Sequence, residues 1–375
     1  MSDRKFTLTP LDFAVDAKLA KGVYIYRFKL DVEQAGTTTT CTVTKRYSQI
    51  RVFTSWARTV SSIAKEKIIP IPSAYTKPSN NTQRKERQIL LAKSLQTALW
   101  TADVAETFEA SFFFGIPYER SLVKGKEVLF PLPDKDFDAS EFSIPWRALR
   151  VSGVNITIAS PSGKQPVPEP YVLRPSGVVM GQLGASFDVL QFWAEISESE
   201  EFQNVISYED INPDAYNALH LNGGHAPGMR EYCGSELLQS KVAKMVERGI
   251  PIGAICHGTL LLARSKGEDG KSVISSRNVT SLPYFMEKAA VTLTSLKLGS
   301  RYYSTYDIPC ATEVASLLDS PKQFQRGPLS GAEATLFDDT NAWVVVDNNI
   351  VTARFPGDAY LYIKTLLKQM AGGNE

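Results

Sequence analysis

Cys256 and His257 are adjacent in the stretch 249–264 (GIPIGAICHGTLLLAR) and could together supply a nucleophile and a proton acceptor. Residues 250–255 are small or apolar without alternation, which predicts a buried strand. Residues 259–264 predict an apolar helix, so only Cys256, His257 and Gly258 are left for the turn between them. A strand that turns sharply into a helix at a nucleophilic residue is a nucleophile elbow, and it holds that residue outward.

The predicted position of Cys256 at a helix N-terminus favours its thiolate. An unperturbed cysteine has a pKa near 8.5, so about 3 % is ionised at pH 7. Unpaired N–H groups and the helix dipole lower that pKa, and we therefore expect Cys256 to be a reactive thiol. An ordinary buried core cysteine is the alternative, which the A-I-C-H-G context disfavours. The other cysteines form no C-x-x-C pair and indicate reduced thiols in an intracellular compartment (Cys41, Cys233, Cys310).

The chain has three histidines, and each lies in or near a candidate motif. We expect His257 to transfer protons, His225 to line the substrate pocket and His220 to be a core residue on a strand. No ligand spacing supports a zinc site at His225, so no metal is predicted. The sequence identifies no acid partner for His257, and Asp358 is predicted to cap a helix N-terminus.

Length and charge divide the chain into two parts. A length of 375 residues predicts two domains, which we place at 1–120 and 125–375. The net charge of +1 conceals an asymmetry, because residues 1–120 hold 18 Lys and Arg against 11 Asp and Glu. This basic excess predicts an anionic partner for the N-terminal part. The first residues have no apolar run of the kind that targets secretion, so a cytoplasmic protein is expected.

The N-terminal part is predicted to be α+β. Residues 5–41 have strand character with a turn at 33–36. Helical spacing follows over 52–63, then a proline-punctuated loop over 68–78 and a second helix over 83–100.

This order of elements, with Lys45-Arg46-Tyr47-Ser48 after the third strand, resembles the phox homology (PX) domain over residues 5–116. The resemblance implies a three-stranded sheet with helices and binding to phosphatidylinositol 3-phosphate. Arg46 would hold the 3-phosphate, Tyr47 would stack on the inositol ring, and Lys77 and Arg87 would bind other phosphates. Ile50 departs from the family, which usually has an aromatic residue there.

The PX resemblance also implies a place for the protein on membranes. Ile68, Ile69 and Ile71 would enter the lipid headgroup layer beside the phosphate site, on endosomal or vacuolar membranes. The alternative is a solvated basic face that binds protein or nothing. Nucleic acid is not expected, since no aromatic stacking platform or reader motif accompanies the charge.

The C-terminal part alternates strands and helices, which predicts a doubly wound, mostly parallel sheet. The predicted strands cover 127–131, 155–159, 218–221, 250–255 and 343–346, and the predicted helices cover 144–151, 235–247, 259–264 and 358–370.

Four motifs occur here in one order: 138–145 (DASEFSIP), 159–163 (ASPSG), 223–229 (GGHAPGM) and Cys256-His257. Together they resemble the ThiJ/PfpI superfamily, with the class I glutamine amidotransferase-like, flavodoxin-like fold, over about residues 125–372.

The ThiJ/PfpI resemblance implies roles for individual residues. Glu141, four residues before Pro145, would hydrogen-bond the reactive thiol. Without the Pro145 register a solvated glutamate at a helix start would be the interpretation. The Gly223-Gly224 turn and the N–H of His257 would form an oxyanion hole.

The resemblances imply a membrane-recruited cysteine enzyme that acts on a small electrophile without a cofactor. Glyoxalase III-like or deglycase-like conversion of α-oxoaldehydes is the expected reaction. Isonitrile hydration and peptidase activity are alternatives, whereas a glutaminase lacks its distant triad partners. Non-catalytic alternatives are a redox sensor or chaperone with an oxidised Cys256, and a lipid-binding scaffold. The aromatic-rich segment 283–330 is expected to be a lid or a homodimer contact.

Overall fold

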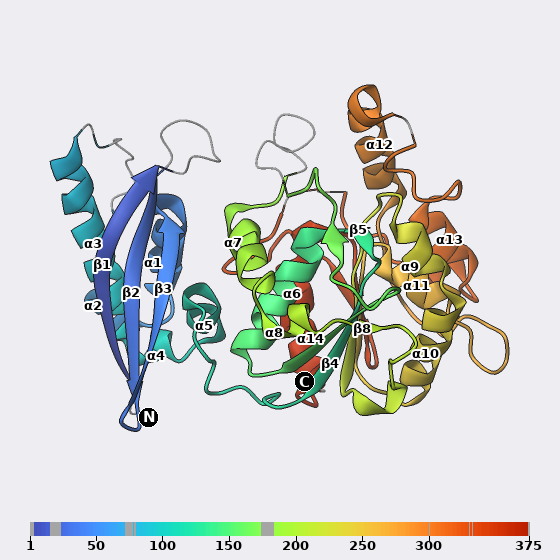
Figure 1. The fold of residues 1–375 in the computed structure, drawn as a ribbon, viewed down its shortest axis with the longest axis horizontal. Coiled ribbons are helices and arrows are strands. Elements are labelled where there is room, and N and C mark those ends of the chain that lie inside the picture. The colour runs from blue at the N-terminus through green and yellow to red at the C-terminus, as the bar shows by residue number, and fades with distance from the viewer. Residues whose placement is uncertain are drawn as a thin grey trace. The chain divides into compact units, whose positions relative to one another are not determined.

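The computed structural model describes residues 4–15, 24–71, 78, 80–173, 184–299, 301–329, 331 and 333–373. The chain divides into two compact units, Met1–Arg120 and Ser121–Glu375 (Figure 1). Each unit is considered by itself below. Lys77, predicted to bind phosphate, lies outside the described residues.

The N-terminal unit is built on an antiparallel sheet in the order β1-β2-β3. Its strands are β1 (Lys5–Val15), β2 (Tyr24–Gln34) and β3 (Thr37–Arg46). The β2–β3 turn places Ala35 and Gly36 at positive φ, where glycine carries no steric penalty. Five helices follow: α1 (Tyr47–Ala57), α2 (Ser62–Lys67), α3 (Asn81–Leu99), α4 (Ala102–Ala105) and α5 (Phe108–Phe114). A small α+β unit with three strands is thus present, as expected.

The isoleucines predicted to enter a membrane are placed differently in the structure. Ile68 is fully buried and Ile71 is 9 % exposed, because both side chains pack into the core of the unit. The prediction that they contact lipid is therefore wrong for these two residues. Ile89, expected on the apolar side of α3, is instead 48 % exposed.

The C-terminal unit contains a seven-stranded sheet in the order β11-β12-β10-β9-β4-β6-β8. Its strands are β4 (Glu127–Pro131), β6 (Asn155–Ser160), β8 (Ile206–Ser207), β9 (Ala218–Leu221), β10 (Ile252–Ile255), β11 (Val344–Asp347) and β12 (Ile350–Ala353). Every pairing is parallel except β11 with β12. A parallel sheet must be covered on both faces, and the apolar strands β9 and β10 are buried accordingly.

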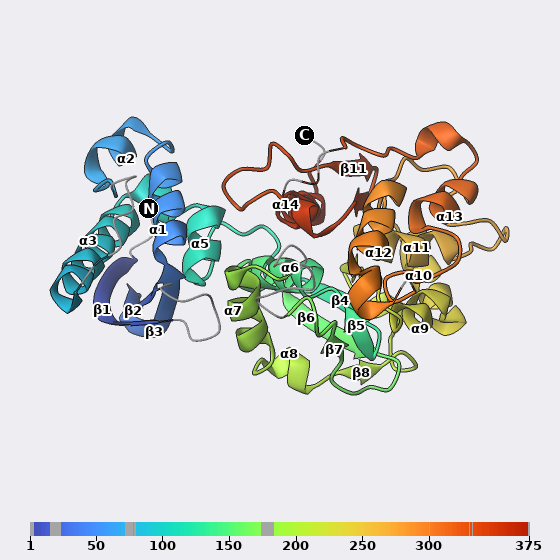
Figure 2. The same cartoon turned by 90° about the horizontal axis from the view of Figure 1, so that it is seen from above.

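Helices cover both faces of this sheet (Figure 2). On one face lie α6 (Ala139–Val151) and α14 (Ala359–Met370), which contact each other and the strands. On the other face α10 (Glu236–Glu247) packs beside α11 (Gly258–Arg264). The other elements are β5 (Lys135–Phe137), β7 (Val167–Pro168), α7 (Phe187–Ile196), α8 (Glu200–Gln203), α9 (Met229–Gly234), α12 (Tyr284–Leu298), α13 (Cys310–Ser316) and three 3₁₀ turns at Pro213–Ala215, Pro321–Gln323 and Pro356–Asp358.

The last strand differs from its prediction. Residues 343–346 were expected to end the parallel sheet, but β11 is an antiparallel edge strand and β12 pairs with β10. A tight turn with Asn348 at φ +54° joins them. The sequence pattern predicts one strand in this region and does not predict the hairpin. Among the described residues no helix is both long and apolar enough to span a bilayer.

Candidate active site

The turn between β10 and α11 holds Cys256 at the carboxyl end of a central strand. Cys256 has φ +56°, a strained value for a non-glycine residue, and is 3 % exposed. A Cβ at position 258 would lie 2.1 Å from the carbonyl oxygen of Leu221, so only glycine fits there. Because Gly258 has no side chain, its backbone can pass close to the Leu221 carbonyl and α11 can begin two residues after Cys256. The elbow geometry expected from the sequence is therefore present.

His257 lies between Cys256 and an acid that the sequence did not identify. Its Nδ1 is 3.6 Å from Cys256 Sγ, and its Nε2 is 3.9 Å from Glu287 Oε1. Glu287 lies on α12, and its other carboxylate oxygen accepts a hydrogen bond of 2.9 Å from the N–H of Cys310. A thiol, an imidazole and a carboxylate thus stand in sequence, as in a nucleophile–base–acid triad.

Burial sets the protonation of this triad. It lowers the pKa of His257 to about 3, so the imidazole is neutral and able to accept a proton. It raises the pKa of Glu287 to about 7, against the lowering effect of the Cys310 N–H. Glu287 therefore changes charge near neutral pH, directly behind the imidazole.

Glu141 approaches the thiol from the first turn of α6. Asp138 caps that helix, and its Oδ1 accepts hydrogen bonds from the N–H groups of Ser140 (2.8 Å) and Glu141 (3.0 Å). A Cβ at Gly223 would lie 2.3 Å from Glu141 Oε2 and 2.5 Å from Cys256 Cβ. Because Gly223 has no side chain, the Glu141 carboxyl can lie close to Cys256.

The Glu141 carboxyl is buried, and neither oxygen makes a hydrogen bond of ordinary distance and angle within the described part of the chain. Burial, followed by the negative charge of Asp138, raises the pKa of Glu141 well above its ordinary value. The Cys256 thiol and the Gly223 N–H nevertheless lie close enough to oppose this rise of the Glu141 pKa. A protonated Glu141 can donate a hydrogen bond or a proton toward Cys256.

The thiol itself is in a less favourable setting than the sequence suggests. Burial, and then the charge of Glu141, raise the pKa of Cys256 well above its ordinary value, while the N–H of Gly224 lowers it. The expected lowering by a helix N-terminus is therefore opposed by desolvation. A negative charge on Glu141 therefore disfavours ionisation of the Cys256 thiol.

The Gly223-Gly224 turn is tied to the start of α6. Asn222 Nδ2 donates to the carbonyls of Asp138 (3.2 Å) and Gly223 (2.8 Å), and the Asp138 N–H donates to the Gly223 carbonyl (3.0 Å). Gly224 has φ +138°, which a side chain rarely tolerates. These bonds hold the predicted oxyanion donor beside Cys256.

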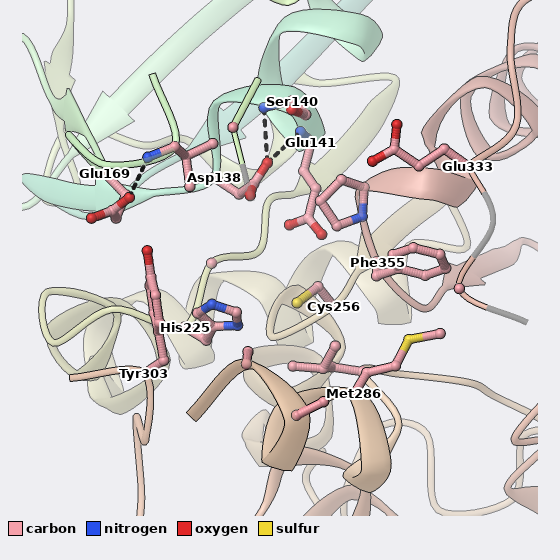
Figure 3. Close-up of a pocket in the computed structure, with 18 of the residues that line it drawn as sticks. Asp138, Ser140, Glu141, Glu169, His225, Cys256, Met286, Tyr303, Glu333 and Phe355 are labelled. Carbon is pink, nitrogen blue, oxygen red and sulfur yellow. Dashed lines mark hydrogen bonds between the residues drawn. The ribbon is translucent and has the colours of Figure 1, made fainter. Parts of the chain in front are cut away.

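The elbow opens into a cavity of about 280 Å³ (Figure 3). His225 lines this cavity, with its ring centroid 4.3 Å from that of Tyr303 and 6.4 Å from that of His257. Burial lowers the pKa of His225 to about 4. Met286 and Leu293 of α12 form an apolar wall, so the inserted segment supplies part of the cavity.

Two polar residues near the site are structural. His220 is fully buried, its Nδ1 is 2.7 Å from the Tyr362 hydroxyl, and burial lowers its pKa to about 3. Asp358 precedes α14, but its carboxylate makes no cap. It binds the guanidinium of Arg354 through two bonds of 2.8 Å, and both residues are fully buried. Asp358 therefore occupies the predicted N-cap position of α14, but its side chain makes no capping bond, because the buried arginine requires that carboxylate.

In the N-terminal unit the structure brings together three residues of the predicted phosphoinositide site, the phosphate ligands Arg46 and Arg87 and the stacking residue Tyr47. Arg46 ends β3 and Tyr47 begins α1. The guanidinium of Arg87, on α3, lies 4.9 Å from the centre of the Tyr47 ring, and that of Arg84 lies 4.8 Å from the Tyr24 ring. Arg87 therefore occupies one face of the aromatic ring expected to stack on inositol.

Sequence reasoning missed Glu287 and Glu169, which reach the site from segments without a motif. These residues lie far from Cys256 along the chain, so no sequence motif or periodicity could have identified them. Tyr303 belongs to the aromatic-rich segment 283–330 that was expected to be a lid or a dimer contact, and it lines the cavity. Within the described ranges no group of three or more His, Cys, Asp or Glu residues is arranged to hold a metal ion.

Comparison with known proteins gives a family match and several distant relatives. Residues 132–328 match the family described as ThiJ/PfpI family-like. Deglycase PfpI of Pyrococcus furiosus is 28 % identical over 155 residues, covering 40 % of this chain and 75 % of that protein. The "Probable glutathione-independent glyoxalase hsp3103" of Schizosaccharomyces pombe is 25 % identical over 169 residues, covering 44 % of this chain and 58 % of that protein.

A solved structure of glyoxalase III from Candida albicans is 18 % identical to this chain. It covers 66 % of this chain and 97 % of its own length, with a TM-score of 0.48.

Proposed function

The chain belongs to the ThiJ/PfpI-like family, whose match covers more than half of it, and we propose from this premise that its C-terminal unit is a cofactor-independent cysteine enzyme of the glyoxalase or deglycase type. The observation that carries the proposal is the order of Cys256, His257 and Glu287, with Glu141 against the thiol. Relatives named as deglycase and glyoxalase support the same reaction class.

The first step is addition of the thiol to an aldehyde. His257 Nδ1 takes the proton of Cys256 as a bond forms between sulfur and the aldehyde carbon. The carbonyl π bond becomes an alkoxide, held by the N–H groups of Gly224 and His257. Protonated Glu141 gives its proton to this oxygen, which forms the hemithioacetal and leaves Glu141 ionised. Ionised Glu287 stabilises the imidazolium that this step creates.

The second step moves a hydrogen from one carbon to its neighbour. Ionised Glu141 removes the C1 proton of the hemithioacetal and returns it to C2, while the proton of the C1 hydroxyl passes to the α-oxo oxygen. The α-oxo group becomes an alcohol and the C1 carbon a thioester. Water then adds its hydroxide to the thioester carbon and gives its other proton to Glu141. The carbon–sulfur bond breaks, the thiolate takes back the proton of His257, and a 2-hydroxy acid is released. The sum is one water added per oxoaldehyde, with no external oxidant or reductant.

The size of the cavity bears on the alternatives. A volume of about 280 Å³ is at the lower end for small-molecule pockets and suits a small electrophile better than a polypeptide. Isonitrile hydration remains compatible with this volume. Redox sensing by Cys256 would use the same thiol without turnover.

A substrate panel tests the proposal. Wild type and Cys256→Ser are assayed side by side with methylglyoxal, glyoxal, an isonitrile and a peptide, and product is identified as 2-hydroxy acid, formamide or cleaved peptide. We expect 2-hydroxy acid from the oxoaldehydes in wild type alone. Turnover that persists in Cys256→Ser, or a formamide product only, would contradict the glyoxalase proposal.

We propose also that the N-terminal unit recruits the protein to membranes that contain phosphatidylinositol 3-phosphate. This is supported by the basic excess of residues 1–120 and by the placement of Arg46, Tyr47 and Arg87 where two helices and a strand meet. Guanidinium groups bind phosphate through paired hydrogen bonds. Co-sedimentation with vesicles carrying this lipid tests recruitment, and equal binding to phosphatidylserine vesicles would argue for charge alone.

A further inference from the structure

One wall of the catalytic cavity is acidic. Asp136, Asp138, Glu169 and Glu333 line it together with Glu141, and no lysine or arginine lines it among the described residues. Glu169 is only 2 % exposed, so its charge is kept from bulk water. In such surroundings an uncompensated carboxylate interacts strongly with any cation that enters.

Glu169 is held in a fixed position within this wall. Its Oε1 accepts a hydrogen bond of 2.9 Å from the Tyr302 hydroxyl, and its Oε2 accepts one of 2.6 Å from the N–H of Val172. Both partners are neutral, so the carboxylate is oriented without being neutralised.

The Tyr303 hydroxyl is a second, independent polar group of this wall. Tyr303 is 1 % exposed, and its hydroxyl makes no hydrogen bond of ordinary distance and angle in the described part of the chain. Burial, followed by the charge of the nearby Glu169, raises the pKa of this hydroxyl. Figure 3 shows Tyr303 along the side of the cavity, with its oxygen directed toward Glu169. A buried hydroxyl without a partner costs stability, which a ligand in the cavity would recover.

The acidic groups of the wall also affect one another. Burial raises the pKa of Asp138 to about 6, and the charges of Glu169 and Glu333 add to this rise. The N–H groups that donate to Asp138 act in the opposite direction. A cation placed between these carboxylates would relieve their repulsion.

We propose that Asp138, Glu169 and Tyr303 form a subsite that binds an ammonium or guanidinium group on the molecule that Cys256 attacks. The inference rests on the proposed function and adds a preference to it: among the carbonyl compounds that Cys256 attacks, those that carry such a cation bind more tightly than neutral ones. The apolar side chains of Met286, Leu293 and Phe355 line the same cavity and suit a short carbon chain between the two groups.

Charged thiol reagents test this subsite in the full-length protein. Cys256 is modified with three methanethiosulfonates that carry an aminoethyl cation, a sulfonatoethyl anion or a neutral methyl group. We expect the cation to react at least about tenfold faster than the anion, relative to their rates with free thiol. Glu169→Gln should lower that ratio about tenfold, because it removes the charge while its amide oxygen can still accept the Val172 N–H and its amide NH2 can donate to the Tyr302 oxygen.

Two variants check the assignment of that effect. Asp138→Asn also removes one charge of the subsite, and asparagine caps a helix as well as aspartate does. It should lower the ratio as Glu169→Gln does. Glu247→Gln removes an exposed charge at the end of α10 and should leave the ratio as in wild type.

A binding measurement separates the subsite from the chemistry. In Cys256→Ser, calorimetry compares propylguanidinium with propylurea, its neutral isostere. We expect the cation to bind at least about tenfold more tightly, with the preference lost in Glu169→Gln. No preference in this comparison overturns the subsite, as does a reagent ratio unchanged in both acidic variants. An inert Cys256 with the guanidinium preference intact overturns the proposed function and leaves the subsite standing.

Discussion

The two units differ in how deeply they bury their functional charged groups. In the C-terminal unit Glu141, His257 and Glu287 are each 5 % exposed or less and crowd around one sulfur. In the N-terminal unit Arg84 and Arg87 are only partly buried and lie over tyrosine rings.

This difference predicts how each site responds to change. A buried group has no solvent to replace a lost partner, so one substitution leaves its neighbours unsatisfied and the effect is large. The attraction of a partly exposed cation for an anion is screened by salt and supplemented by neighbouring charges. Replacing one such cation therefore has a smaller effect on binding, and that effect depends on ionic strength.

Gly258→Ala should have the largest effect, because its Cβ would meet the Leu221 carbonyl at 2.1 Å. We expect a loss of about 3 kcal/mol or more in the free energy of unfolding, which lowers the unfolding temperature by about 6–12 °C. Gly267→Ala is the control, since the nearest atom to its Cβ would be a flexible Asp269 oxygen at 3.4 Å. Equal unfolding temperatures for the two variants would mean that the elbow is less crowded than described.

Glu141→Gln should lower turnover of the oxoaldehyde by a factor on the order of a hundred, as for loss of a general acid–base. The amide keeps the shape of the side chain but cannot shuttle the proton. Glu236→Gln, an exposed glutamate in the first turn of α10, is the matched control and should be fully active. If Glu141→Gln also retains full turnover, Glu141 has a structural role only.

Arg46→Ala should weaken binding to vesicles with phosphatidylinositol 3-phosphate about thirtyfold, because a charge-assisted pair of bonds to phosphate is lost. Lys85→Ala removes an exposed charge from α3 and should weaken binding only about fivefold. Sedimentation at two salt concentrations measures both variants. Similar losses for both would reduce the site to a general basic face and would remove the distinction from phosphatidylserine.

Glu287→Gln should lower turnover about tenfold at pH 8, because the imidazolium of His257 loses its carboxylate partner. Since burial raises the pKa of Glu287 to about 7, the carboxylate is protonated below that pH and ionised above it. Wild-type turnover should therefore rise with pH through about 7, and the variant should lack this limb of the profile. An unchanged profile would show that Glu287 positions no charge at the reacting thiol.

Local sequence determined much of the C-terminal site. The strand, the turn and the helix of the elbow lie within residues 249–264. The register of Glu141 with Pro145 likewise lies within one helix. The α/β class with a mostly parallel sheet and the ThiJ/PfpI family were predicted on this basis and are confirmed. Short-range backbone preferences and steric limits are properties of neighbouring residues, so the sequence expresses them directly.

Only the tertiary structure decided which distant side chains complete the site. Glu287 reaches His257 because α12 packs against α13 and its carboxylate receives the N–H of Cys310. The Asp358 carboxylate binds the buried Arg354 guanidinium and makes no capping bond, and the Ile68 side chain packs in the core and not at the surface. The pKa of Cys256 depends on burial, which no local pattern reports. Contacts between remote segments follow from close packing of the whole unit, where each buried charge must find the partner that the fold brings to it.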